Sequence, residues 1–124
     1  MSTRKAVVER YFDGFRRSDH AQILSCLTDD VVWEIKGFKT LRGKAEYDSE
    51  IENPAFVGSP TLDVEHVAEE GDVVMASGTG AGTQADGTEF RFAFAEVFAF
   101  SGDLVGRRES FVVPLSGESS LPGA

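Results

Sequence analysis

The chain has 124 residues and a formal net charge of −9, with 41% hydrophobic and 27% charged residues. This length suits one globular domain with its own core and is too short for two. The acidic excess disfavours nucleic acids and anionic membrane surfaces as partners, because both are bound through Lys and Arg. A single cysteine, Cys26, excludes an internal disulfide, and no apolar run reaches the length of a membrane span. We therefore expect a cytoplasmic protein.

The first two predicted elements are helices. An amphipathic helix is expected over about residues 3–17, because apolar side chains recur there at helical spacing. Asp19, followed three positions later by Gln22, resembles a capping box and predicts the start of a short second helix. The apolar stripe of the first helix consists of Val8, Tyr11, Phe12 and Phe15.

A strand and a third helix are predicted next. Residues 31–36 predict a strand in which Trp33 and Ile35 share a face. A helix is expected over residues 43–53, ended by Pro54. The flanking residues 38–42 and 55–60 are expected to be loops, the second carrying an exposed aromatic residue, Phe56.

Long strands are predicted for the second half of the sequence. Turn signals recur about every 15 residues from residue 70 onward, which predicts a meander of antiparallel hairpins. The glycines at 78, 80 and 82 lie on one face of one strand, where strong sheet curvature or close approach of another segment would explain them. The expected strands are residues 61–68, 73–84, 88–100 and 104–113.

Three helices followed by a long antiparallel sheet predict an α+β fold. Residues 1–113 are expected to form a single domain. Residues 114–124 are polar and rich in Gly, Ser and Pro, which predicts a flexible C-terminal tail.

One of these strands places a carboxylate among aromatic rings. Over residues 88–100, alternation puts Glu96 on the same face as the phenylalanines. Desolvation there would favour the neutral acid over the carboxylate. The alternative is that a bulge reverses the two faces and leaves Glu96 in solvent. The phenylalanines are Phe90, Phe92, Phe94, Phe98 and Phe100.

The last strand presents a second carboxylate. Unbroken alternation puts Glu109 on the same face as Val105 and Phe111. Two carboxylates in an apolar cleft are a candidate functional site. The alternative is that Glu109 only pairs with a nearby arginine: Arg91, Arg107 or Arg108.

Signatures of metal, nucleotide and serine-nucleophile sites are missing. Cys26, His20 and His66 do not form a metal-binding pattern. The Gly-x-Gly repeats at 78–82 lie within a strand and precede no helix, unlike a nucleotide loop. We therefore expect no cofactor and no metal.

Two stretches of the sequence carry a family pattern. The first joins Val7-Val8-Glu9-Arg10-Tyr11 to Asp29-Asp30-Val31-Val32-Trp33-Glu34, and the second joins Glu70-Gly71-Asp72-Val73-Val74, Asp86-Gly87 and Gly102-Asp103-Leu104-Val105. Over nearly residues 4–113 the chain resembles SnoaL-like and ketosteroid-isomerase-like proteins of the nuclear transport factor 2-like superfamily. The resemblance implies a cone-shaped, curved antiparallel sheet with three N-terminal helices around an apolar pocket. This superfamily hosts isomerases, cyclases, epoxide hydrolases, dehydratases and non-enzymes, so the fold alone does not decide the function.

The resemblance to ketosteroid isomerase implies roles for three residues. Tyr11 matches the tyrosine, and Glu96 the protonated acid, that hold the oxyanion in that family. The position of the family's base falls on Ile35, which cannot abstract a proton.

Two other branches of the superfamily bear on Glu109. The stretch Arg108-Glu109-Ser110-Phe111 resembles the segment with one acid of limonene-epoxide-hydrolase-like enzymes, but their other Arg and Asp are not evident at Met75 and Ser77. In a SnoaL-like cyclase, Glu109 would act as the base.

The leading hypothesis is a pocket that binds a small, largely apolar molecule, with isomerase-like or cyclase-like acid–base chemistry on a carbonyl or enol. Tyr11 and Glu96 would donate to an oxyanion, and Glu109 would be the base. The alternatives are a non-catalytic ligand-binding or dimerisation module and an epoxide-hydrolase-like enzyme. The expected cavity walls are Trp33, Ile35, Phe56, Phe98 and Phe111.

A homodimer is expected from the outer face of the sheet. Residues 93–99 present small and apolar side chains there, which leave little charge to solvate. These side chains are Ala93, Ala95, Val97 and Ala99.

Overall fold

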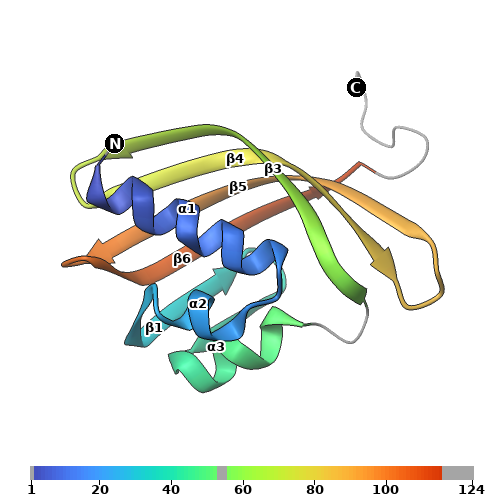
Figure 1. Ribbon diagram of the computed structural model, residues 1–124, viewed down its shortest axis with the longest axis horizontal. Helices are drawn as coiled ribbons and strands as arrows, with labels where there is room; N and C mark the ends of the chain where they lie inside the picture. The colour runs from blue at the N-terminus through green and yellow to red at the C-terminus, as the bar shows by residue number, and fades with distance from the viewer. Residues whose placement is uncertain (1, 53–55, 116–124) are drawn as a thin grey trace.

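The computed structural model describes residues 2–52 and 56–115, which form three helices and one six-stranded sheet. The helices are α1 (Thr3–Arg16), α2 (His20–Leu24) and α3 (Gly43–Ile51). The strands are β1 (Leu27–Ile35), β2 (Lys39–Arg42), β3 (Phe56–Glu70), β4 (Val73–Gln84), β5 (Glu89–Ser101) and β6 (Leu104–Pro114). The predicted α+β fold is confirmed, and its sheet is strongly curved without closing on itself (Figure 1).

The strand order is β2-β1-β6-β5-β4-β3. Strands β3 to β6 form the predicted antiparallel meander. Strand β1 joins this meander in parallel beside β6, and β2 pairs antiparallel with β1 at the edge. The parallel contact brings the side chains of β1 next to those of β6, although the two strands are far apart in sequence.

Two segments expected to be loops are strands. Residues 39–42 form β2, because Leu41 pairs with Trp33 across the ladder and is buried in the core. Strand β3 begins at Phe56, where it already pairs with Gln84 of β4. Pro54, the expected end of the third helix, lies outside the described residues. The expected tail over residues 114–124 lies outside them too, except for Pro114, which ends β6, and Leu115.

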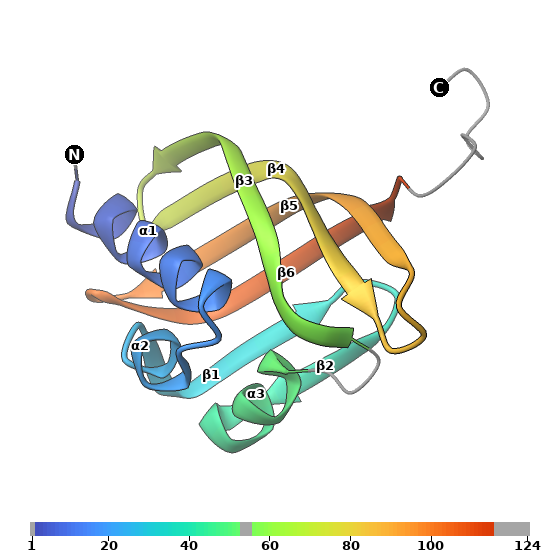
Figure 2. The ribbon, with the colours of Figure 1, turned by 45° about the vertical axis from the view of Figure 1, so that its right-hand side comes forward.

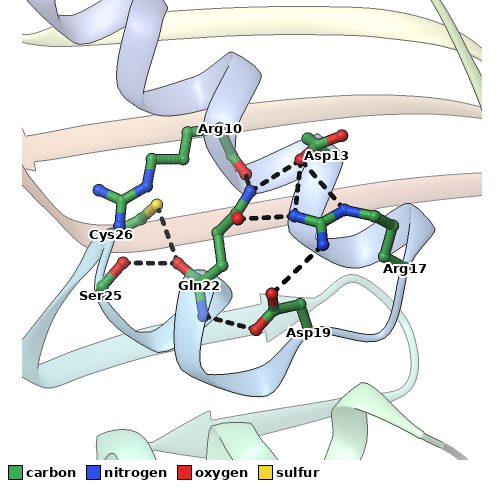
Figure 3. Close-up of polar contacts among 7 residues, drawn as sticks. All are labelled: Arg10, Asp13, Arg17, Asp19, Gln22, Ser25 and Cys26. Carbon is green, nitrogen blue, oxygen red and sulfur yellow. Dashed lines mark hydrogen bonds and ion pairs between the residues drawn. The ribbon is translucent and has the colours of Figure 1, made fainter.

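Helices α1 and α2 are joined by polar contacts (Figure 3). The side chain of Asp19 accepts a hydrogen bond of 3.0 Å from the backbone N–H of Gln22, which confirms the predicted cap. The Gln22 amide donates to the carbonyl oxygen of Arg10 and to Asp13, and Arg17 donates to Asp13 and to Gln22. These contacts fix the turn between α1 and α2.

The strand glycines allow β3 to lie very close to β4. A Cβ atom on Gly78 would lie 2.0 Å from the carbonyl oxygen of Asp63 on β3, and one on Gly80 would lie 2.7 Å from that of Thr61 on β3. The pairing of β3 with β4 is interrupted twice, as in a sheet that bends sharply. Close approach within the curved sheet therefore explains Gly78 and Gly80, whereas Gly82 has no such contact.

All three helices cover the same face of the sheet (Figure 2). Helix α1 crosses this face, and α2 and α3 lie near β1 and β2. No helix in the described part of the chain is long and apolar enough to cross a membrane. The largest side chains buried between these layers include Tyr11, Tyr47, Phe98, Ile23 and Leu27.

Candidate functional site

A cavity of about 690 Å³ lies between the helices and the inner face of the sheet. Phe38 and Phe56 are 65% and 39% exposed and mark its open side, whereas Glu96 and Arg108 lie at its buried end. The walls between are mostly aromatic: Phe12, Phe15, Trp33, Phe90, Phe92 and Phe94. Such a cavity suits a largely apolar molecule with one polar end.

Arg108 on β6 places a cation at this buried end. Its Nε donates to Oε1 of Glu96 at 2.6 Å, and its Nη1 donates to the hydroxyls of Tyr11 and Tyr47. Burial alone would lower the pKa of the guanidinium, but Glu96 and the two tyrosines raise the pKa of Arg108 well above its ordinary value. Arg108 is therefore a permanent charge inside the cavity.

Aromatic rings and Ser110 hold this ion pair in place. The guanidinium carbon of Arg108 lies 4.3 Å from the ring centre of Trp33 and 5.0 Å from that of Tyr11. The indole N–H of Trp33 donates to the Ser110 hydroxyl at 2.8 Å, and this hydroxyl donates to Oε1 of Glu96 at 2.6 Å. The arrangement of the pair is thus fixed by side chains from α1, β1, β5 and β6.

Tyr11 and Tyr47 form a buried hydroxyl pair beside Arg108. Their oxygens are 2.5 Å apart, and neither side chain is exposed. Burial raises the pKa of both phenols, so both are protonated at neutral pH. Each hydroxyl can therefore both donate and accept a hydrogen bond.

Five of the residues singled out in the sequence line the cavity: Tyr11, Trp33, Ile35, Phe56 and Glu96. Phe98 does not, because it is fully buried against Tyr11 and Phe12 in the core. The predicted face of β5 is confirmed, since Glu96 is only 4% exposed. Within the site, Oε1 of Glu96 accepts hydrogen bonds from Arg108 and Ser110.

The expected placement of Glu109 and Phe111 is wrong. A bulge at Gly106 interrupts the pairing of β5 with β6, so Val105 faces inward and the residues after the bulge change faces. Glu109 consequently lies on the outer face, where it pairs with Lys36 at 3.2 Å and with Arg107 at 3.6 Å. The second of these pairs fulfils the alternative considered for Glu109. Phe111 is 41% exposed on the same outer face.

The SnoaL-like domain model matches residues 8–107 of the chain. The chain belongs to the SnoaL-like domain family. This match covers most of the sequence and includes the elements that carry Tyr11, Trp33 and Glu96. The comparison with curated proteins gave no match.

Solved structures similar to this SnoaL-like chain show the same fold. An NTF2-like protein of unknown function from Burkholderia pseudomallei is 21% identical, with a TM-score of 0.83 over 91% of this chain and 92% of that one. TerC, co-crystallised with polyporic acid, is 24% identical, with a TM-score of 0.80 over 90% and 92%. An epoxide hydrolase of M. tuberculosis, described as LEH-like, is 17% identical, with a TM-score of 0.78 over 90% and 83%. The chain is thus a nuclear transport factor 2-like protein in fold.

The SnoaL-like site contains three polar residues that sequence reasoning did not place there. Arg108 and Ser110 reach the cavity only because the bulge at Gly106 reverses the faces of β6. Gly106 is the sequence feature that could have predicted this reversal, since a glycine within a strand often marks a bulge. Tyr47 is buried, but α3 has few apolar residues that would have predicted its inner face.

Side-chain contacts join helix α3, which carries Tyr47, to the start of α2. His20 contacts Asp48 through Nδ1 at 2.6 Å and Glu52 through Nε2. These two carboxylates raise the pKa of the His20 imidazole. The described residues contain no cluster of His, Cys, Asp and Glu that could hold a metal ion. The polar side chains at the buried end of the cavity are those around Arg108, and Lys36, Glu50 and Glu52 line other parts of it.

Proposed function

We propose that this SnoaL-like domain binds a small, largely apolar molecule whose oxygen-bearing end reaches Arg108. The observation that carries the proposal is a charged guanidinium at the buried end of an aromatic cavity. A buried charge is costly and is retained where it has a partner or a role. Aromatic walls favour flat, apolar ring systems, and the cavity volume of about 690 Å³ suits a molecule of two or three rings.

Acid–base chemistry on a carbonyl or enol is the reaction that these groups support best. Glu96 takes the place proposed for Glu109, because Glu96 lines the cavity and Glu109 does not. Its carboxylate would accept a proton from the bound molecule, and Arg108 would stabilise the negative charge left on oxygen. The hydroxyls of Tyr11 and Tyr47 accept hydrogen bonds from Nη1 of Arg108 and help to hold the guanidinium in place.

Ile35 favours a second candidate function. It lines the cavity. The resemblance to ketosteroid isomerase assigns it the position of that family's base, so a binding protein without catalysis is compatible with the same pocket. Both candidates require binding at Arg108, and they differ in whether the bound molecule exchanges a proton with Glu96.

Binding can be tested with Trp33, the single tryptophan of the chain. Its indole N–H bonds to Ser110 beside the ion pair, so its resonance in a proton–nitrogen correlation spectrum reports on the site. Titration with methyl 2-naphthoate should shift this resonance with micromolar affinity. The hydrocarbon 2-ethylnaphthalene should bind at least about 10-fold more weakly, because it offers no oxygen to Arg108.

The matched variants are R108Q and R107Q, which alter neighbouring residues on opposite faces of β6. R108Q should weaken binding of methyl 2-naphthoate about 10-fold or more, and R107Q should leave it unchanged. The comparison of the two probes on the wild-type protein stands even if R108Q does not fold. Equal affinity for both probes, or no binding of either, would contradict the proposal.

A further inference from the structure

Two polar atoms at the buried end of the cavity have no hydrogen-bond partner among the described residues. Arg108 uses Nε and Nη1 in hydrogen bonds, and Glu96 uses Oε1. Neither Nη2 of Arg108 nor Oε2 of Glu96 bonds to any residue within 2–52 and 56–115. In that part of the chain, Oγ1 of Thr28 is the side-chain oxygen or nitrogen that is both fully buried and without a partner. Nη2 and Oε2 also lack partners, so neither of them is fully buried, and both keep accessible surface. Both side chains line the cavity.

These two atoms are opposite in kind. Nη2 of Arg108 can only donate hydrogen bonds, and Oε2 of an ionised Glu96 can only accept them. The side chains that carry them are held by Trp33, Ser110 and the tyrosine pair, with exposures of only 8% for Arg108 and 4% for Glu96. A ligand therefore meets a donor and an acceptor that are already fixed in position.

The charges at this end of the cavity cancel. Arg108 contributes a positive charge and Glu96 a negative one, joined by a contact of 2.6 Å. An anion bound to Nη2 would gain attraction from Arg108 but would also lie beside the Glu96 carboxylate in a poorly solvated site. A neutral group that accepts from Nη2 and donates to Oε2 satisfies both atoms without adding charge.

We infer that the site recognises a neutral group with an oxygen acceptor next to an N–H or O–H donor, as in an amide, an undissociated acid, or a hydroxyl beside a carbonyl. The acceptor binds Nη2 of Arg108, and the donor binds Oε2 of Glu96. The apolar remainder of the molecule lies against the phenylalanines of β5. The inference rests on the proposed binding function and specifies the polar end of the molecule that is bound.

Three probes with the same naphthalene ring test this inference on the wild-type protein. 2-Naphthamide offers an acceptor and a donor, methyl 2-naphthoate offers only acceptors, and 2-naphthoate is an anion at pH 7. Titration calorimetry should give 2-naphthamide an affinity about 10-fold or more above that of the ester, because only the amide satisfies Glu96. The anion should bind more weakly than the amide.

Glu96→Gln provides a second measurement, with Glu109→Gln on the outer face as its control. E96Q should reduce the preference for the amide over the ester to less than about 3-fold, and E109Q should keep it. Equal binding of amide and ester by the wild-type protein, with both weakened by R108Q, would overturn this inference and leave the proposed binding function intact. Tightest binding of the anion would overturn it in favour of an anion site on Arg108. Failure of all three probes to bind would count against the proposed function itself.

Discussion

Arg108 and Glu96 form an ion pair that the surrounding residues make tolerable in the core. Moving two charges out of water costs several kcal/mol for each ion, and one contact seldom compensates for it. Here Ser110 supplies another hydrogen bond to Glu96, and Trp33 and Tyr11 present ring faces to the guanidinium. The buried ion pair is therefore stable only while these surrounding groups are present.

Removing the charge of Glu96 should therefore destabilise the protein far more than removing the charge of Glu109. Glu96→Gln removes the negative charge beside buried Arg108 and should lower the free energy of unfolding by about 3–5 kcal/mol. Glu109→Gln alters an ion pair on the outer face, where the carboxylate is 28% exposed, and should cost at most about 1 kcal/mol. Urea denaturation of both variants measures the difference. Similar losses in the two variants would mean that the ion pair contributes little.

At the scale of single elements, the alternation of apolar residues predicts a face only while a strand stays regular. Strand β5 pairs with β4 without interruption from Val73 to Thr83, and the predicted inner face with Glu96 is correct along it. Strand β6 has the bulge at Gly106, so simple alternation predicts the wrong face for every side chain after the bulge. Thus the sequence predicted Glu96 and Tyr11 in the cavity but missed Arg108.

Pairing between distant segments was harder to predict than local structure. The capped start of α2 and the hairpin turns depend on a few neighbouring residues, and they were predicted correctly. Strand β2 is short, and its local sequence does not predict a strand; it forms because it pairs with β1. The contact of Tyr47 with Tyr11 and Arg108 depends on where α3 packs, which no local pattern encodes.

The glycines of β4 offer a test of the sheet's curvature. Gly78→Ala would place a Cβ atom 2.0 Å from the backbone oxygen of Asp63, which cannot move without shifting β3. This variant should lose about 1–3 kcal/mol of stability or more. Gly82→Ala would meet only the ring of Phe56 at 3.7 Å and should change stability by less than about 1 kcal/mol. Thermal unfolding of the two variants makes the comparison, and equal melting temperatures would show that β3 is free to move away from β4.

At the scale of the whole molecule, the two faces of the sheet have different surroundings. The inner face is covered by the three helices, whereas no helix within the described residues covers the outer face (Figure 2). Ala95 lies near the middle of that outer face, between Ser77 of β4 and Phe111 of β6. The side chains of Met75, Phe111 and Val113 there are 53%, 41% and 42% exposed. Exposed apolar groups gathered on one face are typical of an interface.

We expect this face to join two copies of the chain in a homodimer. An isologous contact uses the same patch on both subunits. A charged residue introduced at the centre of this patch is therefore present twice, and the two like charges lie close together across the interface. Ala95→Arg should therefore convert the dimer to a monomer at micromolar concentration. Ala6→Arg, the same change at an exposed position of α1, should leave the dimer intact. Light scattering coupled to size-exclusion chromatography measures the mass of both variants and of the wild type. A wild-type mass near 13.4 kDa would contradict the expectation, and a dimer that survives A95R would place the interface on another face.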